Sequence, residues 1–120
     1  MLQVLPGLGE GGVERGAIDI ARFLGEVGWT PLVASAGGES ETALADLGVQ
    51  VFRLPLNAKN PVVIHQNVRR LQRVIHEHDV DLVHARSRAP AWSAYVAARR
   101  CKVPFVTTFH GLYSGSERWL

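Results

Sequence analysis

The chain alternates short apolar runs with longer segments in which apolar residues recur every three or four positions. Short apolar runs bounded by glycine or proline indicate buried strands, and the longer spacing indicates amphipathic helices. The expected strands are Leu2–Pro6, Thr30–Ala36, Val49–Leu54, Asp81–Ala85 and Pro104–Phe109. The expected helices are Val13–Val27, Glu41–Leu47, a segment that starts at Asn60-Pro61, and Pro90–Arg100.

The two longest expected helices have the clearest apolar faces. The face of the first comprises Val13, Ala17, Ile20, Ala21, Leu24 and Val27, and Gly28 then ends the helix. In the second, Asn60 is the expected N-cap and Pro61 the first helical residue. Its apolar face comprises Ile64, Val68, Leu71 and Ile75. Each helix should therefore pack one face against a sheet.

This alternation predicts an α/β fold, a Rossmann-like doubly wound sheet of about five parallel strands. The expected strand order is 3-2-1-4-5. Ligands of such sheets bind at the carboxyl ends of the strands. The expected rim of the site therefore comprises Gly7–Gly12, Ser35–Gly38, Arg86–Arg88 and His110–Gly111.

Composition narrows the class of protein. The chain has 120 residues, enough for one domain, of which 47% are hydrophobic and 20% charged. Its net charge of +2 is too small to indicate a nucleic-acid partner by itself. A single cysteine, Cys101, excludes an intrachain disulfide and fits a reducing compartment. No apolar stretch approaches a membrane span, and no signal peptide is evident. The last residues, Trp119 and Leu120, are large and apolar, so we expect one domain over 1–120 that is truncated at its C-terminus.

The loop after the first strand matches the pattern GxGxxG at Gly7, Gly9 and Gly12. Glycines admit close backbone approach, and the N–H groups of the next helix start face an anion, so the loop predicts a phosphate site. A dinucleotide site also needs an acidic residue at the end of the second strand, and Glu39 lies beyond that turn. A nicotinamide-dependent oxidoreductase is thus a weaker alternative, and a plain tight turn remains open.

Other polar residues border this expected site. Glu14 favours the helix dipole, and Arg15 could reach an anion above the loop. Arg86, Ser87 and Arg88 follow the fourth strand and suit a phosphate or a polyhydroxylated sugar, or else a solvated loop.

His110, beside Gly111, ends the fifth strand. Its imidazole could bind a sugar hydroxyl or assist proton transfer, although a structural role is the alternative. Cys101 is expected to be a small core residue, because no acid–base partner lies near it in sequence.

Two further clusters of polar residues resemble binding sites but can also be explained as ordinary polar helix surface. Arg69, Arg70 and Arg73 share one flank of a helix, which suits either anionic lipid or a solvated face. His76-Glu77-His78-Asp79 resembles a metal site, but on a helix the two histidines point roughly 200° apart. We therefore expect no metal there.

Three segments resemble retaining glycosyltransferases of family 4, which have the GT-B fold. Residues 4–16, with Gly11-Gly12-Val13-Glu14, resemble the glycine loop that opens the N-terminal domain of that family. Residues 81–92, beginning Asp81-Leu82-Val83-His84, are similar to a second motif, and residues 106–111 to a third that ends in histidine and glycine. The likeness covers nearly the whole chain, in the right order.

The resemblance implies the N-terminal, acceptor-side domain of an enzyme that transfers a hexose-type sugar from a nucleotide-sugar donor. The acceptor would be a glycan or a lipid-linked molecule of the kind used for cell-envelope polysaccharide or lipopolysaccharide. No cofactor and no obligatory metal are implied. The protein would be cytoplasmic, with a peripheral contact at the inner face of the membrane and no nucleic-acid partner.

By the same resemblance, Gly9, Gly11 and Gly12, with Glu14 and Arg15, would approach the donor diphosphate, and His110 would contact the donor sugar. Acceptor-binding residues would be Arg86, Ser87, Arg88 and Gly111. The helix carrying Arg69, Arg70 and Arg73 would face the membrane. The family's C-terminal domain is not in this sequence, so the chain alone should be inactive. A non-catalytic Rossmann-like binding module is the remaining alternative.

Overall fold

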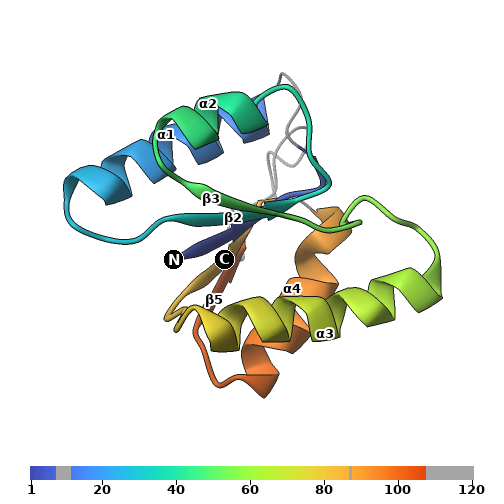
Figure 1. The fold of residues 1–120 in the computed structure, drawn as a ribbon. Coiled ribbons are helices and arrows are strands. Elements are labelled where there is room, and N and C mark those ends of the chain that lie inside the picture. The colour runs from blue at the N-terminus through green and yellow to red at the C-terminus, as the bar shows by residue number, and fades with distance from the viewer. Residues whose placement is uncertain (8–11, 87, 108–120) are drawn as a thin grey trace, which may run out of the picture.

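The computed structural model describes residues 1–7, 12–86 and 88–107 (Figure 1). Within these ranges, it describes the backbone alone for residues 12, 13, 88 and 89. The strands in these ranges are β1 (Leu2–Val4), β2 (Leu32–Ser35), β3 (Gln50–Arg53), β4 (Val83–Ala85) and β5 (Phe105–Thr107). The helices are α1 (Gly12–Glu26), α2 (Glu41–Asp46), α3 (Pro61–Glu77) and α4 (Arg88–Arg100). The predicted helices and strands are therefore present, and they follow one another in the predicted order.

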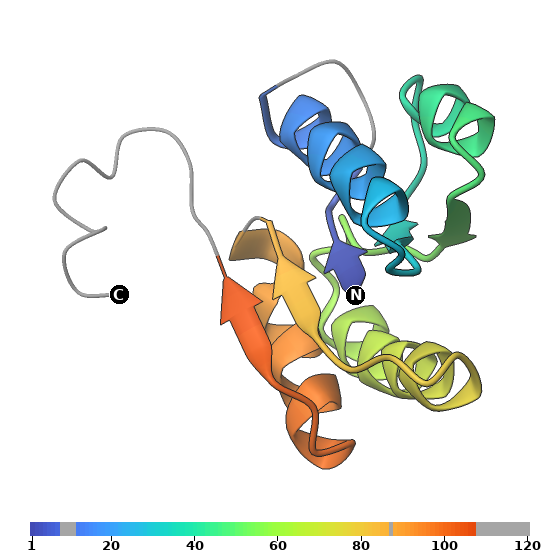
Figure 2. The ribbon, with the colours of Figure 1, turned by 90° about the vertical axis from the view of Figure 1, so that its left-hand side faces the viewer.

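The five strands form a single parallel sheet in the order β3-β2-β1-β4-β5, which confirms the predicted fold class and strand order. Helices α1 and α2 cover one face, and α3 and α4 cover the other (Figures 1 and 2). Strands β1 and β4 are neighbours although most of the chain's first two-thirds separates them. This crossover brings the segments after β1 and β4 to the same edge of the sheet.

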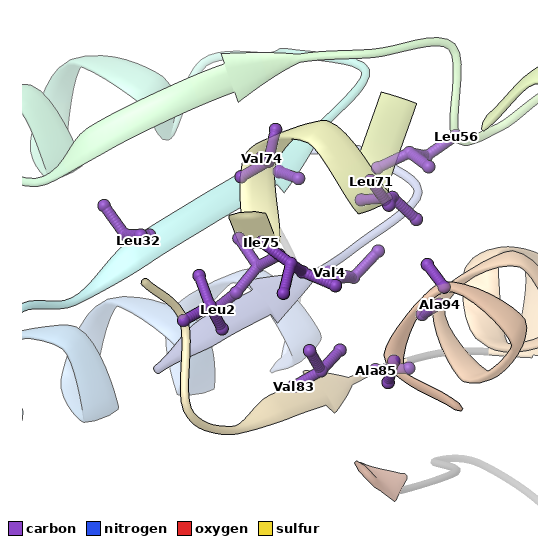
Figure 3. Packing of buried hydrophobic residues seen from close by; sticks show 14 of the residues in the cluster. Leu2, Val4, Leu32, Leu56, Leu71, Val74, Ile75, Val83, Ala85 and Ala94 are labelled. Carbon is purple, nitrogen blue, oxygen red and sulfur yellow. The ribbon is translucent and has the colours of Figure 1, made fainter. Parts of the chain in front are cut away.

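The larger core lies between the sheet and the α3/α4 layer. Leu2 and Val4 of β1 and Val83 of β4 point toward Leu71 and Ile75 of α3 (Figure 3). Small residues of α4, Ala94, Ala97 and Ala98, are also fully buried and let that helix approach closely. A second, smaller cluster under α1 and α2 comprises Leu5, Ala17, Ala21, Val33, Leu44 and Val49.

Helix α3 begins as its sequence predicts. The Asn60 side chain accepts a hydrogen bond from the Val62 backbone N–H at 2.8 Å, and Pro61 is the first helical residue. Of its expected apolar face, Val68, Leu71 and Ile75 are buried, and Ile64 is half-buried. The spacing of four, three and four was therefore a reliable guide to the buried side.

The apolar face of α1 differs from the prediction at its end. Ala17, Ala21 and Leu24 are buried, but Val27 is 52% exposed, because α1 stops at Glu26. Gly28 has φ +90° there, and the Gly28 and Trp29 N–H groups bond back to Gly25 and Leu24 carbonyls. This glycine-terminated motif turns the chain before Val27 can reach the core.

The boundaries of three later elements also differ. The fourth strand begins at Val83 rather than Asp81, and the fifth at Phe105 rather than Pro104. Helix α4 begins at Arg88, two residues before the expected Pro90. Within the described ranges, no helix combines the length and apolar character needed to cross a bilayer.

We predict that Leu71→Ala lowers the free energy of unfolding by about 2–5 kcal/mol, because it leaves a cavity in the α3/α4 core. The control is Val62→Ala in the same helix, where the side chain is 63% exposed and the change should be within about 0.5 kcal/mol. Urea unfolding of both variants measures the difference. Equal losses would show that α3 does not bury the predicted face.

Candidate functional site

The candidate site lies at the carboxyl edge of the sheet, where β1 and β4 end side by side. Helix α1 starts at Gly12, shortly after β1, so its N-terminal turn lies at this edge. Of the predicted glycine loop, Gly9 and Gly11 lie outside the described residues. In the first turn of α1, Glu14 is half-buried and Arg15 is exposed. A helix start at this edge offers backbone N–H groups to an anion.

Arg86 is the cation of this site. It follows β4 directly, is 7% exposed, and its backbone N–H donates to the Val4 carbonyl at 2.9 Å. Its Nε donates to the Gln3 side-chain oxygen, Oε1, at 2.6 Å. Among the described residues, no carboxylate oxygen lies within 4.0 Å of its guanidinium. Burial lowers the pKa of Arg86 from its usual range, but the group stays charged at neutral pH.

Gln3 is a functional candidate that the sequence analysis missed. It lies in the middle of β1 and is 0% exposed. Its Nε2 donates to the Ala17 carbonyl of α1 at 3.0 Å, while its Oε1 accepts from Arg86. The one signal in the sequence was a glutamine within an otherwise apolar strand. Both ends of its amide are therefore used, one on the helix and one on the arginine.

Gly16 is a second candidate that the sequence analysis missed. A Cβ atom built on it would lie 3.1 Å from Arg86 Nη1, closer than ordinary side-chain contacts. The missing side chain thus leaves room for the guanidinium against α1. The helix, the buried glutamine and the arginine form one connected group, which we call the Arg86 cluster: Gln3, Gly16, Ala17 and Arg86.

The remaining predicted site residues are placed as follows. Arg88 is the first residue of α4, on the layer opposite α1. Ser87, His110 and Gly111 lie outside the described residues. Of the predicted site residues after β4, Arg86 is thus the residue that the structure places against α1.

The three arginines of α3 differ from one another. Arg69 and Arg73 are exposed, whereas Arg70 is half-buried and its Nη1 donates to Asn67 Oδ1 at 2.9 Å. The buried Asn67 in turn donates to the Pro55 carbonyl at 2.9 Å. Arg70 therefore supports the connection between β3 and α3, and Arg69 and Arg73 are the members presented to solvent.

Other features fall outside the candidate site. The described residues include no group of three or more metal-ligating side chains, and the His78 ring packs on Phe52 at a centroid distance of 4.8 Å. A cavity of about 460 Å³ is lined by residues including Trp29, Thr30 and Asp81. Those residues precede β2 and β4, so this cavity is at the opposite edge of the sheet from Arg86.

The parallel sheet, with helices on both faces and a helix start at its carboxyl edge, is Rossmann-like. The family model described as Glycosyltransferase Family 4 matches residues 10–120. The chain belongs to this family. A comparison with curated proteins gives no match.

Solved structures agree with the fold. A glycosyltransferase from Rickettsia africae ESF-5 is similar, with a TM-score of 0.81, 38% identity, and 98% of this chain and 32% of that chain covered. MurG from Acinetobacter baumannii has a TM-score of 0.76 at 17% identity, covering 98% and 37%. HepE from Anabaena, in complex with UDP and glucose, has a TM-score of 0.66 at 21% identity, covering 97% and 31%. The chain spans about a third of the length of each of these structures.

Cys101 lies outside the Arg86 cluster and packs against the α3/α4 core, as the sequence predicted. It is partly buried, its Sγ lies 3.9 Å from the Gln72 carbonyl, and burial raises the pKa of the thiol. A raised pKa means less thiolate at a given pH.

We therefore predict that iodoacetamide modifies Cys101 more slowly than a free cysteine peptide at pH 8, and that the rate rises at higher pH than it does for the peptide. Mass spectrometry after timed quenching measures the rate. Unfolding in urea should remove the difference. A native rate equal to or above the peptide rate would contradict the structural role.

Proposed function

We propose that the chain is the acceptor-side domain of a retaining glycosyltransferase that uses a nucleotide-sugar donor. The observation that carries the proposal is membership of Glycosyltransferase Family 4 over residues 10–120. The structure of HepE with UDP and glucose supports a nucleotide-sugar donor, because its fold is similar to that of this chain. In this proposal a second Rossmann-like half carries the nucleotide pocket.

The Arg86 cluster gives this proposal a physical basis. Glycosyl transfer leaves a nucleoside diphosphate, on which negative charge develops as the bond to the sugar breaks. Preorganised N–H donors and cations stabilise such charge most where water is excluded. The start of α1 and the buried guanidinium of Arg86 supply both kinds of group at one edge of the sheet. Glu14 and Arg15 border that edge.

The acceptor and the sugar would bind along the same rim. We assign Arg88, Ser87 and Gly111 to the acceptor and His110 to the donor sugar, on the family resemblance of their motifs. Arg86, which that resemblance also gave to the acceptor, is assigned to the diphosphate instead, because its guanidinium lies against α1. The sugar would be a hexose, and the acceptor a glycan or lipid-linked molecule of the cell envelope. No metal is required in this proposal, since the N–H groups and Arg86 face the diphosphate. Exposed Arg69 and Arg73 would contact anionic lipid at the cytoplasmic face.

Turnover of the complete gene product that contains this chain tests the function. We expect transfer from a UDP- or GDP-sugar to a lipid-linked or glycan acceptor, with the anomeric configuration retained in the product by NMR. The 120-residue chain alone should show no transfer. Hydrolysis or transfer by the chain alone would contradict the division into two halves, and saturable NAD binding would favour the oxidoreductase alternative.

We predict that His110→Ala lowers kcat of the complete gene product by about 10²-fold, as expected for loss of one preorganised donor at a reacting sugar. The melting temperature should change little. The control is His65→Ala, an exposed histidine of α3, which should leave both values unchanged. Parallel losses of kcat and melting temperature for His110→Ala would indicate a structural histidine.

A further inference from the structure

Arg86 is buried, and among the residues that the structure describes no carboxylate pairs with it. A guanidinium that loses its contact with water normally gains a carboxylate, because an unpaired buried charge is unfavourable. Here the described residues supply only a neutral amide, the Oε1 of Gln3 at 2.6 Å. This part of the fold therefore fixes the orientation of the cation, and its described residues do not neutralise the charge.

We propose that Gln3 and Gly16 are positioning residues that hold Arg86 ready for an oxyanion, the terminal phosphate of a diphosphate. The identity of the ligand rests on the proposed function, whereas the geometry of the Arg86 cluster does not. Gln3 fixes Nε, and Gly16 leaves the space that Nη1 occupies. Neither residue touches the ligand, so both act through Arg86.

The choice of glutamine rather than glutamate is central to this role. A glutamate at position 3 would also accept from Arg86 Nε, and it would bind the cation more tightly. Its negative charge, however, would cancel the attraction for an incoming anion, and it would lose the donor that Nε2 offers to the Ala17 carbonyl. A neutral amide is the side chain that anchors both α1 and Arg86 without removing the positive charge.

Gly16 is explained by the same geometry. Glycine destabilises the interior of a helix relative to alanine. Position 16 nevertheless lacks a side chain, and a Cβ there would meet Arg86 Nη1 at 3.1 Å. Gly25 in the same helix is the matched comparison, because a Cβ there would meet nothing within 4 Å.

The Arg86 cluster also lies near the N-terminal turn of α1, where an anion would bind. Residues four apart lie on the same side of a helix, so Gly16 lies one turn below Gly12, where α1 begins. The guanidinium beside Gly16 is therefore close to the first turn, whose N–H groups are not used within the helix. An oxyanion at this start would contact both backbone donors and the Nη edge of Arg86.

The first arm of the test measures geometry in the full 120-residue chain. Gly25→Ala should raise the melting temperature by about 3–5 °C, and Gly16→Ala should fail to raise it or should lower it. In an Arg86→Met background, Gly16→Ala should become as stabilising as Gly25→Ala. Equal gains from both alanines in the wild-type background would overturn the role of Gly16.

The second arm separates position from charge. Binding of inorganic pyrophosphate is measured by calorimetry, and the Arg86 Nε–H signal is followed by NMR, assigned by its loss in Arg86→Met. Gln3→Met should speed solvent exchange of that signal and weaken pyrophosphate binding. Gln3→Glu should keep the signal protected and still weaken binding by about tenfold or more. Wild-type affinity in Gln3→Glu would overturn the proposal.

The two arms also distinguish this proposal from the proposed function. If the wild-type chain does not bind pyrophosphate, the diphosphate assignment is wrong, and protection of Arg86 Nε–H still tests Gln3. If pyrophosphate binds but Gln3→Met and Gly16→Ala bind it as the wild type does, the site is elsewhere and both residues are merely structural. Weakened binding in both variants, with the Gly25→Ala affinity unchanged, supports the positioning role.

Discussion

The hydrogen bond between Gln3 and Arg86 is the interaction on which this structure's functional edge depends. It joins the middle of β1 to the residue that directly follows β4, and the other end of the same amide holds α1 through the Ala17 carbonyl. Among the described residues, this nearly buried guanidinium has the Gln3 amide and no carboxylate as its side-chain partner. One buried side chain therefore fixes the relative positions of a cation and of the helix that begins at Gly12.

The rest of the fold makes this arrangement possible. Parallel pairing of β1 with β4 puts the two chain segments at one edge, and the α3/α4 core holds these strands from the other face. The side chains of Gln3 and Arg86 belong to the face covered by α1, opposite Val4 and Ala85, which point into the larger core (Figure 3). The larger hydrophobic core thus lies on one face of the sheet, and on the other face the Arg86 cluster lies beside the smaller hydrophobic cluster under α1 and α2.

The sequence predicted the architecture well because apolar spacing and capping residues act locally. The strand order, the start of α3 at Asn60 and its buried face were confirmed. The error at Val27 arose because the apolar spacing includes Val27, whereas α1 ends one residue earlier, at Glu26, and the turn at Gly28 leaves the Val27 side chain exposed. Boundaries of this kind depend on hydrogen bonds that a pattern does not contain.

The candidate site was only partly predictable. Arg86 was selected from its place after a strand, but its burial and its partner depend on a contact across 83 positions in sequence. Gln3 lies outside the motif segments, and Gly16 ends one of them without an assigned role, so each stands out only once α1 is placed over the sheet. Roles for Arg88 and His110 remain proposals that rest on the family's motifs.

A crystal structure of the complete gene product that contains this chain, with a bound nucleoside diphosphate, is the most direct measurement. The account predicts a phosphate oxygen within hydrogen-bond distance of both Arg86 Nη and a backbone N–H in the first turn of α1, with Gln3 still bonded to Nε. A diphosphate bound away from this edge, or Arg86 paired with a carboxylate in its place, would contradict it.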